Sequence, residues 1–207
     1  GRHLWVTGVP GRSFTQNCHV AGFETGFADH CGFVFSELMK GGGVGANYSS
    51  QYLSALTPLS KVEVRFICSE EHADIDVLRP LLGENNYREP GDPARGFLVR
   101  VDDSREGWVD SLVTLLTAAS YDGPGKGNPY TIIFDVSDVR PQGSPIRGFG
   151  GISSGPFPLV KMLNDVAQLL PAEVTPELAM RIDHLIASAV IAGNVRRSAR
   201  MSIMHWN

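Results

Sequence analysis

The stretch between residues 96 and 134 alternates strand-like and helix-like sequence. Gly96 to Val101 and Tyr130 to Phe134 are short runs rich in β-branched and aromatic residues, which is typical of strands. The segment between them places four large apolar residues on one helical face: Trp108, Leu112, Leu115 and Leu116. Asp103 and Glu106 stand before it at capping-box spacing. Strand, helix and strand in this order predict a parallel strand pair with a right-handed crossover, and therefore an α/β fold.

The second strand of this unit leads into a loop whose residues suit a polyanion. Arg140 and Arg147 bracket a turn, and the glycines after them let the backbone approach a ligand closely. Ser153, Ser154 and Gly155 supply hydroxyl and backbone N–H groups just before a predicted helix. Two cations at a strand end and a glycine-serine loop at a helix start favour a phosphate-rich ligand such as a nucleotide.

The remaining elements are predicted from the same patterns. Strands are expected at 16–23, 44–48, 62–68 and 201–203, and helices at 28–40, 157–170 and 176–193. Asp29 and Thr175 are the predicted N-caps of the first and last of these helices. The middle one is expected to bury four residues: Leu159, Met162, Leu163 and Val166. The polar, proline-containing stretch 69–95 is interpreted as a variable excursion without chemistry.

Composition limits the partners of the chain. A net charge of -4 over 207 residues argues against wide contact with nucleic acid. No apolar run reaches the roughly 18 to 20 residues of a membrane span, and the N-terminus lacks the pattern of a signal peptide. A cytoplasmic protein without membrane contact is therefore expected. The chain starts without Met, and we expect it to be a segment of a longer protein.

The residue types that bind metals do not form a convincing site. Three widely spaced cysteines without a CxxC pair argue against structural zinc: Cys18, Cys31 and Cys68. Free cysteines in a reduced compartment are most simply small buried residues. A solvated helix face explains His72, Asp74 and Asp76 as well as a metal site does, so no metal site is expected there.

A short arginine-rich segment follows the last predicted helix. The turn after Gly193 carries four polar side chains: Asn194, Arg196, Arg197 and Arg200. Arginines there either complement the negative end of the helix, worth roughly 0.3 to 1 kcal/mol each, or bind an anion. The residue pattern alone leaves these two interpretations even.

Six stretches together resemble one enzyme family. In chain order they are QNCH, ELMKGGGVG, DSREGW, DVSDVRP, RGFGG with SSGP, and AGNVRRSA. Their order and separations are similar to those of the adenosylcobalamin-dependent ribonucleoside-triphosphate reductases, the monomeric class II ribonucleotide reductases. The resemblance covers residues 1–207. It implies part of the ten-stranded α/β barrel of the reductases, together with an effector-binding helical layer and an insertion.

The resemblance implies that the full-length protein reduces ribonucleoside triphosphates through a thiyl radical formed with adenosylcobalamin. Cys18 matches one of the two cysteines that become a disulfide, whereas Cys31 and Cys68 keep their packing interpretation. A thioredoxin-like protein would be the reductant. The second redox cysteine, the radical-bearing cysteine and the cobalamin-binding segment have no counterpart in this chain, so the chain alone is expected to be inactive.

The family is also controlled by a deoxynucleoside triphosphate (dNTP) effector. The resemblance assigns residues 28–39 and 49–158 to the effector region, and four residues to effector contacts: Asp29, Arg140, Ile146 and Arg147. Residues 193–200 resemble the specificity loop that carries effector identity to the substrate base. Its polar members are Gly193, Asn194, Arg196, Arg197 and Ser198, which favours function over helix capping for these arginines.

Two alternatives differ in what they require of the sequence. A non-catalytic nucleotide-sensing module would keep the effector site but would not need a thiol at Cys18. A dimeric class II reductase would not need the long stretch 62–102, in which a monomeric enzyme supplies its own partner surface. We therefore expect a monomeric reductase.

Overall fold

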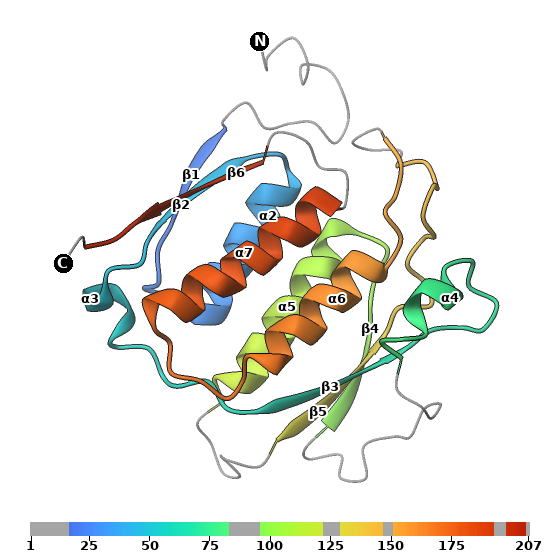
Figure 1. Ribbon diagram of the computed structural model, residues 1–207, viewed down its shortest axis with the longest axis horizontal. Helices are drawn as coiled ribbons and strands as arrows, with labels where there is room; N and C mark the ends of the chain where they lie inside the picture. The colour runs from blue at the N-terminus through green and yellow to red at the C-terminus, as the bar shows by residue number, and fades with distance from the viewer. Residues whose placement is uncertain (1–16, 83–95, 122–128, 147–150, 193–197, 206–207) are drawn as a thin grey trace.

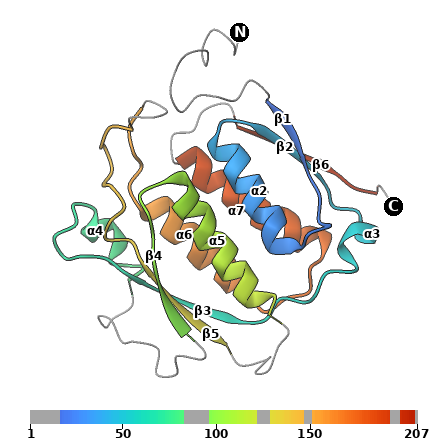
Figure 2. The same ribbon diagram turned by 180° about the vertical axis from the view of Figure 1, so that it is seen from behind.

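The computed structural model describes residues 17–82, 96–121, 129–146, 151–192 and 198–205. Within these residues two three-stranded sheets lie on either side of four long helices (Figure 1). Figure 2 shows from behind that the helices run between the sheets. The predicted α/β class is confirmed, while closure into a ten-stranded barrel stays a prediction.

The first sheet contains strands β1 (Cys18–Ala21), β2 (Gly43–Asn47) and β6 (Ala199–Ile203) in the order β1-β2-β6. All of its pairs are parallel, and Cys18 lies opposite Gly43, which lies opposite Ala199. Helix α2 (Phe27–Met39) makes the crossover between β1 and β2. The three strands expected here are confirmed.

The second sheet contains β3 (Val62–Ile67), β4 (Gly96–Arg100) and β5 (Tyr130–Asp135) in the order β3-β5-β4. Helix α5 (Arg105–Ala119) connects β4 to β5, and these two strands are parallel. The predicted strand-helix-strand unit is therefore confirmed. Its apolar side faces the helices, with Ile132 and Phe134 fully buried in the central strand.

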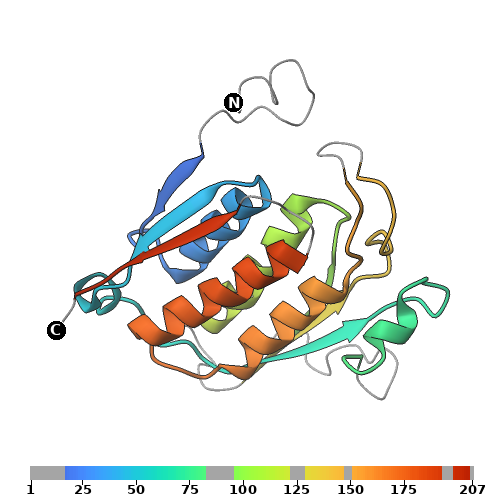
Figure 3. The ribbon, with the colours of Figure 1, turned by 45° about the horizontal axis from the view of Figure 1, so that its top comes forward.

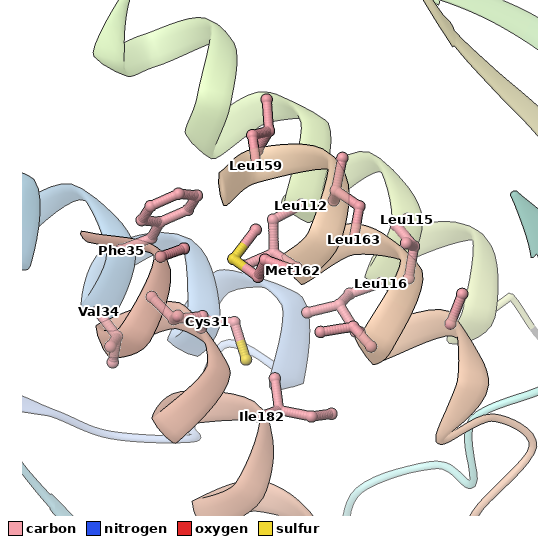
Figure 4. Close-up of a cluster of buried hydrophobic side chains, with 14 of the residues drawn as sticks. Cys31, Val34, Phe35, Leu112, Leu115, Leu116, Leu159, Met162, Leu163 and Ile182 are labelled. Carbon is pink, nitrogen blue, oxygen red and sulfur yellow. The ribbon is translucent and has the colours of Figure 1, made fainter. Parts of the chain in front are cut away.

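Helices α6 (Phe157–Gln168) and α7 (Pro176–Ala192) complete the helical layer. Helix α2 packs against α5 and α7, and α6 packs against α7. The core between them is apolar (Figure 4), and the four residues predicted to be buried on α6 are at most 2% exposed. Cys31 is fully buried in this core, which confirms its packing role. Gly32 allows the closest approach of α2 to α5, since a Cβ there would lie 2.6 Å from Val113 Cγ2.

Two of the three predicted helix caps are wrong. Helix α2 begins at Phe27, and its N-cap is Gly26, whose φ of 118° suits glycine. Asp29 is instead an exposed residue of the first turn. Ser104, rather than Asp103, caps α5, because its Oγ accepts from Gly107 N at 2.9 Å. Thr175 is confirmed as a cap, with Leu178 N donating to its Oγ1 at 3.2 Å.

Two short helices lie outside the central layer. Helix α3 (Ser50–Leu53) follows β2, and α4 (Ile75–Leu78) lies in the described part of the excursion. None of the helices in the described ranges is both long and apolar enough to cross a membrane.

Candidate functional site

The loop between β5 and α6 folds back on itself through backbone hydrogen bonds. Gly143 N donates to Ser153 O at 2.9 Å, Ser153 N to Ser144 O at 2.7 Å, and Ile146 N to Gly151 O at 3.0 Å. Ile146 is half-buried. Arg147 lies outside the described residues. This loop (residues 140–155) is called the arginine loop below.

Arg140 joins the arginine loop to the start of α5. Its Nε donates to both carboxylate oxygens of Asp103, at 2.9 and 2.7 Å. Its Nη1 donates to Pro145 O at 3.2 Å and its backbone N–H to Asp103 Oδ1 at 3.2 Å. A guanidinium has more N–H donors than these contacts use. The side chain is 33% exposed, so it can also bind a ligand from solution.

The serine hydroxyls of the arginine loop are used within the loop. Ser153 is 8% exposed, and its Oγ accepts from Gly155 N at 3.1 Å and donates to Arg140 O at 3.4 Å. Ser154 is half-buried, and its Oγ donates to Gly155 O at 3.3 Å. A phosphate-binding role for these residues stays a prediction. Their observed contacts shape the turn that leads into α6.

Two polar side chains attach the excursion to the arginine loop and to Val139, the residue before it. His72 Nε2 donates to Val139 O at 2.7 Å, and Asp74 Oδ2 accepts from Gln142 N at 2.7 Å. Gly155 has a φ of +71°, and a Cβ on it would lie 2.2 Å from Asp74 Oδ2. The interpretation of His72 and Asp74 as a solvated face is therefore wrong, since Asp74 is only 9% exposed.

No group of three or more potential metal ligands lies together in the described part of the chain. Asp76 is exposed and forms an ion pair with Arg79, with Nε and Oδ1 3.2 Å apart. Of the residues considered as ligands, it alone fits the solvated-face interpretation.

Asp29 does not join Arg140. A small cavity of about 100 Å³ is lined by Lys40, at the end of α2, and by Arg105, at the start of α5. Because the end of one helix lies beside the start of the other, the two helices are antiparallel (Figure 2). Asp29 lies in the first turn of α2, at the other end of a 13-residue helix. Such a helix is about 20 Å long. The predicted effector residues are thus divided between the two ends of the helical layer.

Cys18 lies on the open face of the first sheet. Its neighbour His19 points to the helices and contacts Glu37, with Nε2 and Oε2 3.4 Å apart. Cys18 points the other way and is exposed. The same face carries Val20, Met201 and Ile203, which are 82%, 59% and 51% exposed, and Figure 3 shows that this side of the sheet is turned away from the helices.

Small residues surround Cys18 on this open face. Gly43 and Ala199 lie opposite Cys18 across the sheet. Gly45 is the next residue of the central strand on the same face. A Cβ on Gly43 would lie 3.8 Å from Ala199 Cβ. The strands thus leave space beside the thiol that larger side chains would fill.

A buried polar cluster, which the sequence reasoning missed, lies on the opposite side of the first sheet. Asp183 Oδ2 accepts hydrogen bonds from His30 Nε2 at 3.0 Å, from the Tyr48 hydroxyl and from Arg200 Nη2. Tyr48 is fully buried, and Asp183 and His30 are 1% and 2% exposed. We call these four residues the Asp183 cluster. Asp183 follows the buried Ala179 by four residues, so the two side chains lie on the same face of α7. This spacing could have identified Asp183 as a charged residue within the apolar stripe.

Burial is the main cause of the pKa shifts in this cluster. It raises the pKa of Asp183, and hydrogen bonding and charge from His30 oppose that rise. It also lowers the pKa of Arg200 to about 10. The Cys31 thiol lies nearby, and burial followed by the charge of Asp183 raises its pKa well above the usual value. A thiol in this state is a poor nucleophile.

The predicted specificity loop is described only at its downstream end. Gly193, Asn194, Arg196 and Arg197 lie outside the described residues. Ser198 Oγ donates to Leu38 O at 2.8 Å, which attaches this end of the loop to the last turn of α2. Arg200 follows in β6, within the Asp183 cluster.

Known proteins resemble this chain over most of its length. Residues 73–170 match the family model described as the insertion domain of B12-dependent ribonucleotide reductase. A Mycobacterium phage D29 protein, provisionally named adenosylcobalamin-dependent ribonucleoside-triphosphate reductase, is 40% identical over 100% of this chain. The Lactobacillus leichmannii protein named adenosylcobalamin-dependent ribonucleoside-triphosphate reductase is 32% identical over 98% of this chain. In both cases the chain spans 31% of the length of the relative.

A solved structure has the same arrangement of helices and strands. The crystal structure of a B12-dependent (class II) ribonucleotide reductase matches with a TM-score of 0.81 and 27% identity. The match covers 99% of this chain and 32% of that one. The chain belongs to the family of B12-dependent, class II ribonucleotide reductases.

Proposed function

We propose that this chain supplies a redox thiol and an effector site to an enzyme that reduces ribonucleoside triphosphates to 2′-deoxyribonucleoside triphosphates. The observation that carries the proposal is the position of Cys18, an exposed thiol on the open face of a parallel sheet. Its neighbours across the sheet, Gly43 and Ala199, are small residues. Thiol chemistry requires an accessible sulfur, and Cys31 is excluded because it is fully buried.

The reduction balances with two thiols and one ribonucleotide. The C2′–O bond of the ribose breaks, the oxygen leaves as water, and a C2′–H bond forms. The two electrons come from Cys18 and a second cysteine elsewhere in the full-length protein, and these two become a disulfide. A dithiol reductant of the thioredoxin type then restores both thiols by exchange.

The effector site is proposed at the junction of the arginine loop and the start of α5. Arg140 is held there by Asp103 and keeps N–H donors for a phosphate. Ile146 lies half-buried on the same loop, where it can pack against an effector base, and Arg147 adjoins it in the sequence. The N-terminal end of α5 adds a favourable field for an anion. Asp29 is left out of this site because it lies at the far end of α2.

Two cavities of the described residues are too small for the cobalamin cofactor. The cavity at the start of α2 has a volume of about 470 Å³, and the one beside α5 about 330 Å³. These are the sizes of cavities for drug-sized ligands, and a corrin ring with its nucleotide tail is larger. Adenosylcobalamin is therefore proposed to bind in another part of the full-length protein, where it would supply the radical chemistry.

The catalytic part of the proposal is tested with the full-length protein, adenosylcobalamin, a small dithiol and one ribonucleoside triphosphate at a time. Chromatography should detect the deoxynucleotide only when all components are present. A properly folded protein that binds nucleotide but forms no deoxynucleotide would instead support a nucleotide-sensing module.

The regulatory part is tested by the affinity for dNTP effectors. Arg140→Gln in the full-length protein should weaken the effector at least about tenfold, since a charge-assisted hydrogen bond contributes about 1.5 to 3 kcal/mol. Arg79→Gln is the matched control, because Arg79 is an exposed arginine that forms an ion pair within the excursion. Equal effector dissociation constants for the two variants would refute the site. Light scattering with effector present checks the monomeric state, and a dimer would contradict it.

A further inference from the structure

We infer that Arg200 and Asp183 are positioning residues that fix the downstream end of the specificity loop, and that their loss uncouples effector binding from substrate choice. This inference rests on the proposed function, because it concerns how one site controls the other. Among the described residues, neither forms a hydrogen bond with the arginine loop, and Arg200 lies on the other side of the first sheet from Cys18. Both would act through the backbone to which they belong.

The downstream end of the specificity loop is attached at two points. Ser198 donates to the carbonyl of Leu38 in α2, at 2.8 Å. Arg200 donates to Asp183 in α7, and its Cζ also lies 5.9 Å from the ring centre of Tyr48. In the sequence, residues 193–197 connect the end of α7 to β6, a strand that is held to α7 and α2. These contacts fix the start of β6 relative to both helices.

Four elements meet at one carboxylate oxygen. Besides Arg200 of β6, Oδ2 of Asp183 accepts from His30 of α2 and from Tyr48, which follows β2. His30 is held in turn by the carbonyl of Gly22, at 2.9 Å from Nδ1, and by stacking on Phe23 with ring centres 3.9 Å apart. Both ring nitrogens of His30 thus face acceptors. The cluster is a fixed junction between the helix that packs on α5 and the strand that leaves the loop.

The chemistry of the cluster suits positioning better than simple stabilisation. A buried ion pair gives little stability compared with apolar packing, because both charges lose their hydration. The rest of the buried stripe of α7 is apolar, including Ala179, Ile182 and Ile186. What the charged groups add is a unique geometry, since each donor must point at the same oxygen.

The cluster also has a second pairing available to it. Among the described residues, Asp183 Oδ1 and Arg200 Nη1 are buried without a hydrogen-bond partner. Arginine and carboxylate groups often pair through two parallel hydrogen bonds, and a small rotation of the guanidinium would bring these two atoms together.

The experiment uses the full-length enzyme and two competing ribonucleoside triphosphates, with and without a dNTP effector. Asp183→Asn keeps the shape of the side chain and removes its charge, and Tyr48→Phe removes only one donor. Arg181→Gln is the control, because Arg181 lies on the exposed side of the same helix. The measurements are the product ratio, the turnover without effector and the effector dissociation constant.

We expect Asp183→Asn to reduce the effector-dependent change in product ratio at least about fivefold, the lower end of the usual allosteric coupling. Effector affinity and turnover without effector should stay within about twofold of the unmodified enzyme, which a purely structural defect would not allow. Arg200→Lys, which keeps the charge, should retain part of the effect. If Asp183→Asn does not fold, Tyr48→Phe decides, with a smaller loss in the same direction.

A folded Asp183→Asn or Tyr48→Phe enzyme with an unchanged product ratio would overturn the inference and leave the proposed function intact. Absence of any effector-dependent product ratio in the unmodified enzyme would overturn the proposed regulation itself. These two failures are distinguishable because the second appears before any substitution is made.

Discussion

The two halves of the molecule share one plan but use it differently. One half contains β1, α2, β2, β6 and α7, and the other contains β4, α5, β5, β3 and α6. In both, a strand-helix-strand unit supplies an edge and the centre of a parallel sheet, and a third strand completes it: β1-β2-β6 and β4-β5-β3. Helices α2 and α5 meet at the seam between the halves (Figure 2). The likeness is therefore in topology, and the differences between the halves bear on the proposed role of each.

The outer faces of the two sheets differ in chemistry. The first carries Cys18, Val20 and Met201 around glycines of the central strand, without a charged side chain. The second carries charged residues at Glu63, Arg65 and Arg100. A face of the first kind suits enclosure by other parts of the protein or by a substrate, whereas a charged face suits water. This contrast supports the proposal that the chemistry lies in the first half.

The entries to the two central helices differ as well. Helix α2 starts from Gly26 without a side-chain cap, whereas α5 starts from Ser104, next to the Asp103 that holds Arg140. Of these two helix starts, the start of α5 contacts the arginine loop through the Asp103–Arg140 pair. Regulation is therefore expected at the start of α5, and each prediction below changes one half while using the other as its reference.

The largest effect is expected from Cys18→Ser in the full-length enzyme. A serine hydroxyl cannot form a disulfide, so multiple turnover with a dithiol reductant should fall at least about a thousandfold. Effector affinity should not change, because Cys18 lies on the open face of the other half. The measurement is deoxynucleotide formed per enzyme.

Cys68→Ser is the matched control for this substitution. Cys68 directly follows β3 in the second half and has no place in the proposed chemistry. Its replacement should leave turnover within about twofold of the unmodified enzyme. If both serine variants kept full turnover, the assignment of chemistry to the first half would be wrong.

The second prediction compares the reactivity of these thiols towards alkylation. Burial, followed by the charges of Asp135 and Asp74, raises the pKa of Cys68 to about 11 from an ordinary value of 9.0. Since only the thiolate reacts, Cys68 should react about a hundredfold more slowly than an ordinary exposed thiol at pH 8. Its rate should rise with pH up to about 11 and then level off.

Cys18 is exposed and is the reference for an accessible thiol in the isolated chain. Mass spectrometry of peptides after timed alkylation gives both rates from one sample. Equal rates at pH 8 would show that the surroundings of Cys68 are more open than the structure indicates.

Periodicity predicted the helices and strands of both halves, but it did not predict the polar side-chain contacts between these elements. The buried face of α6 and the parallel pairing of β4 with β5 follow from local pattern, because apolar spacing and strand order suffice. The Asp103–Arg140 pair could not be predicted in this way, since its members are 37 residues apart. The capping-box pattern assigned Asp103 to the helix, but tertiary pairing with Arg140 leaves the cap to Ser104.

The polar contacts of the helical layer could not be predicted from the sequence either. Asp183 and His30 are separated by 153 residues, and only the fold brings them together. The position of Cys18 was easier, because alternation along a strand places it opposite His19. Its proposed role came from resemblance, and the geometry adds only that the thiol is accessible.

The third prediction concerns the residue three positions after each N-cap, which is Asp29 in α2 and Gly107 in α5. A Cβ on Gly107 would lie 2.5 Å from the backbone oxygen of Asp102, which cannot move without distorting the start of the helix. Gly107→Ala should therefore destabilise the protein by about 2 kcal/mol or more. Asp29→Ala, on an exposed position, should change the free energy of unfolding by at most about 0.5 kcal/mol. Denaturant titration of both variants tests the difference, and comparable values would show that the two helix entries are equivalent.

The smallest effect is expected at the cap of α5. Ser104→Ala removes the acceptor of Gly107 N, and loss of such a cap costs about 1 kcal/mol. Ser104→Asp should keep the stability, because a carboxylate accepts the same hydrogen bond and favours the positive end of the helix. It should nevertheless weaken an effector phosphate bound near Arg140, since it adds a second negative charge beside Asp103. Helix stability and effector affinity would then change independently at one position, measured by denaturant titration and by equilibrium binding. A parallel fall in both for Ser104→Asp would mean that the start of α5 is only a structural joint between the halves.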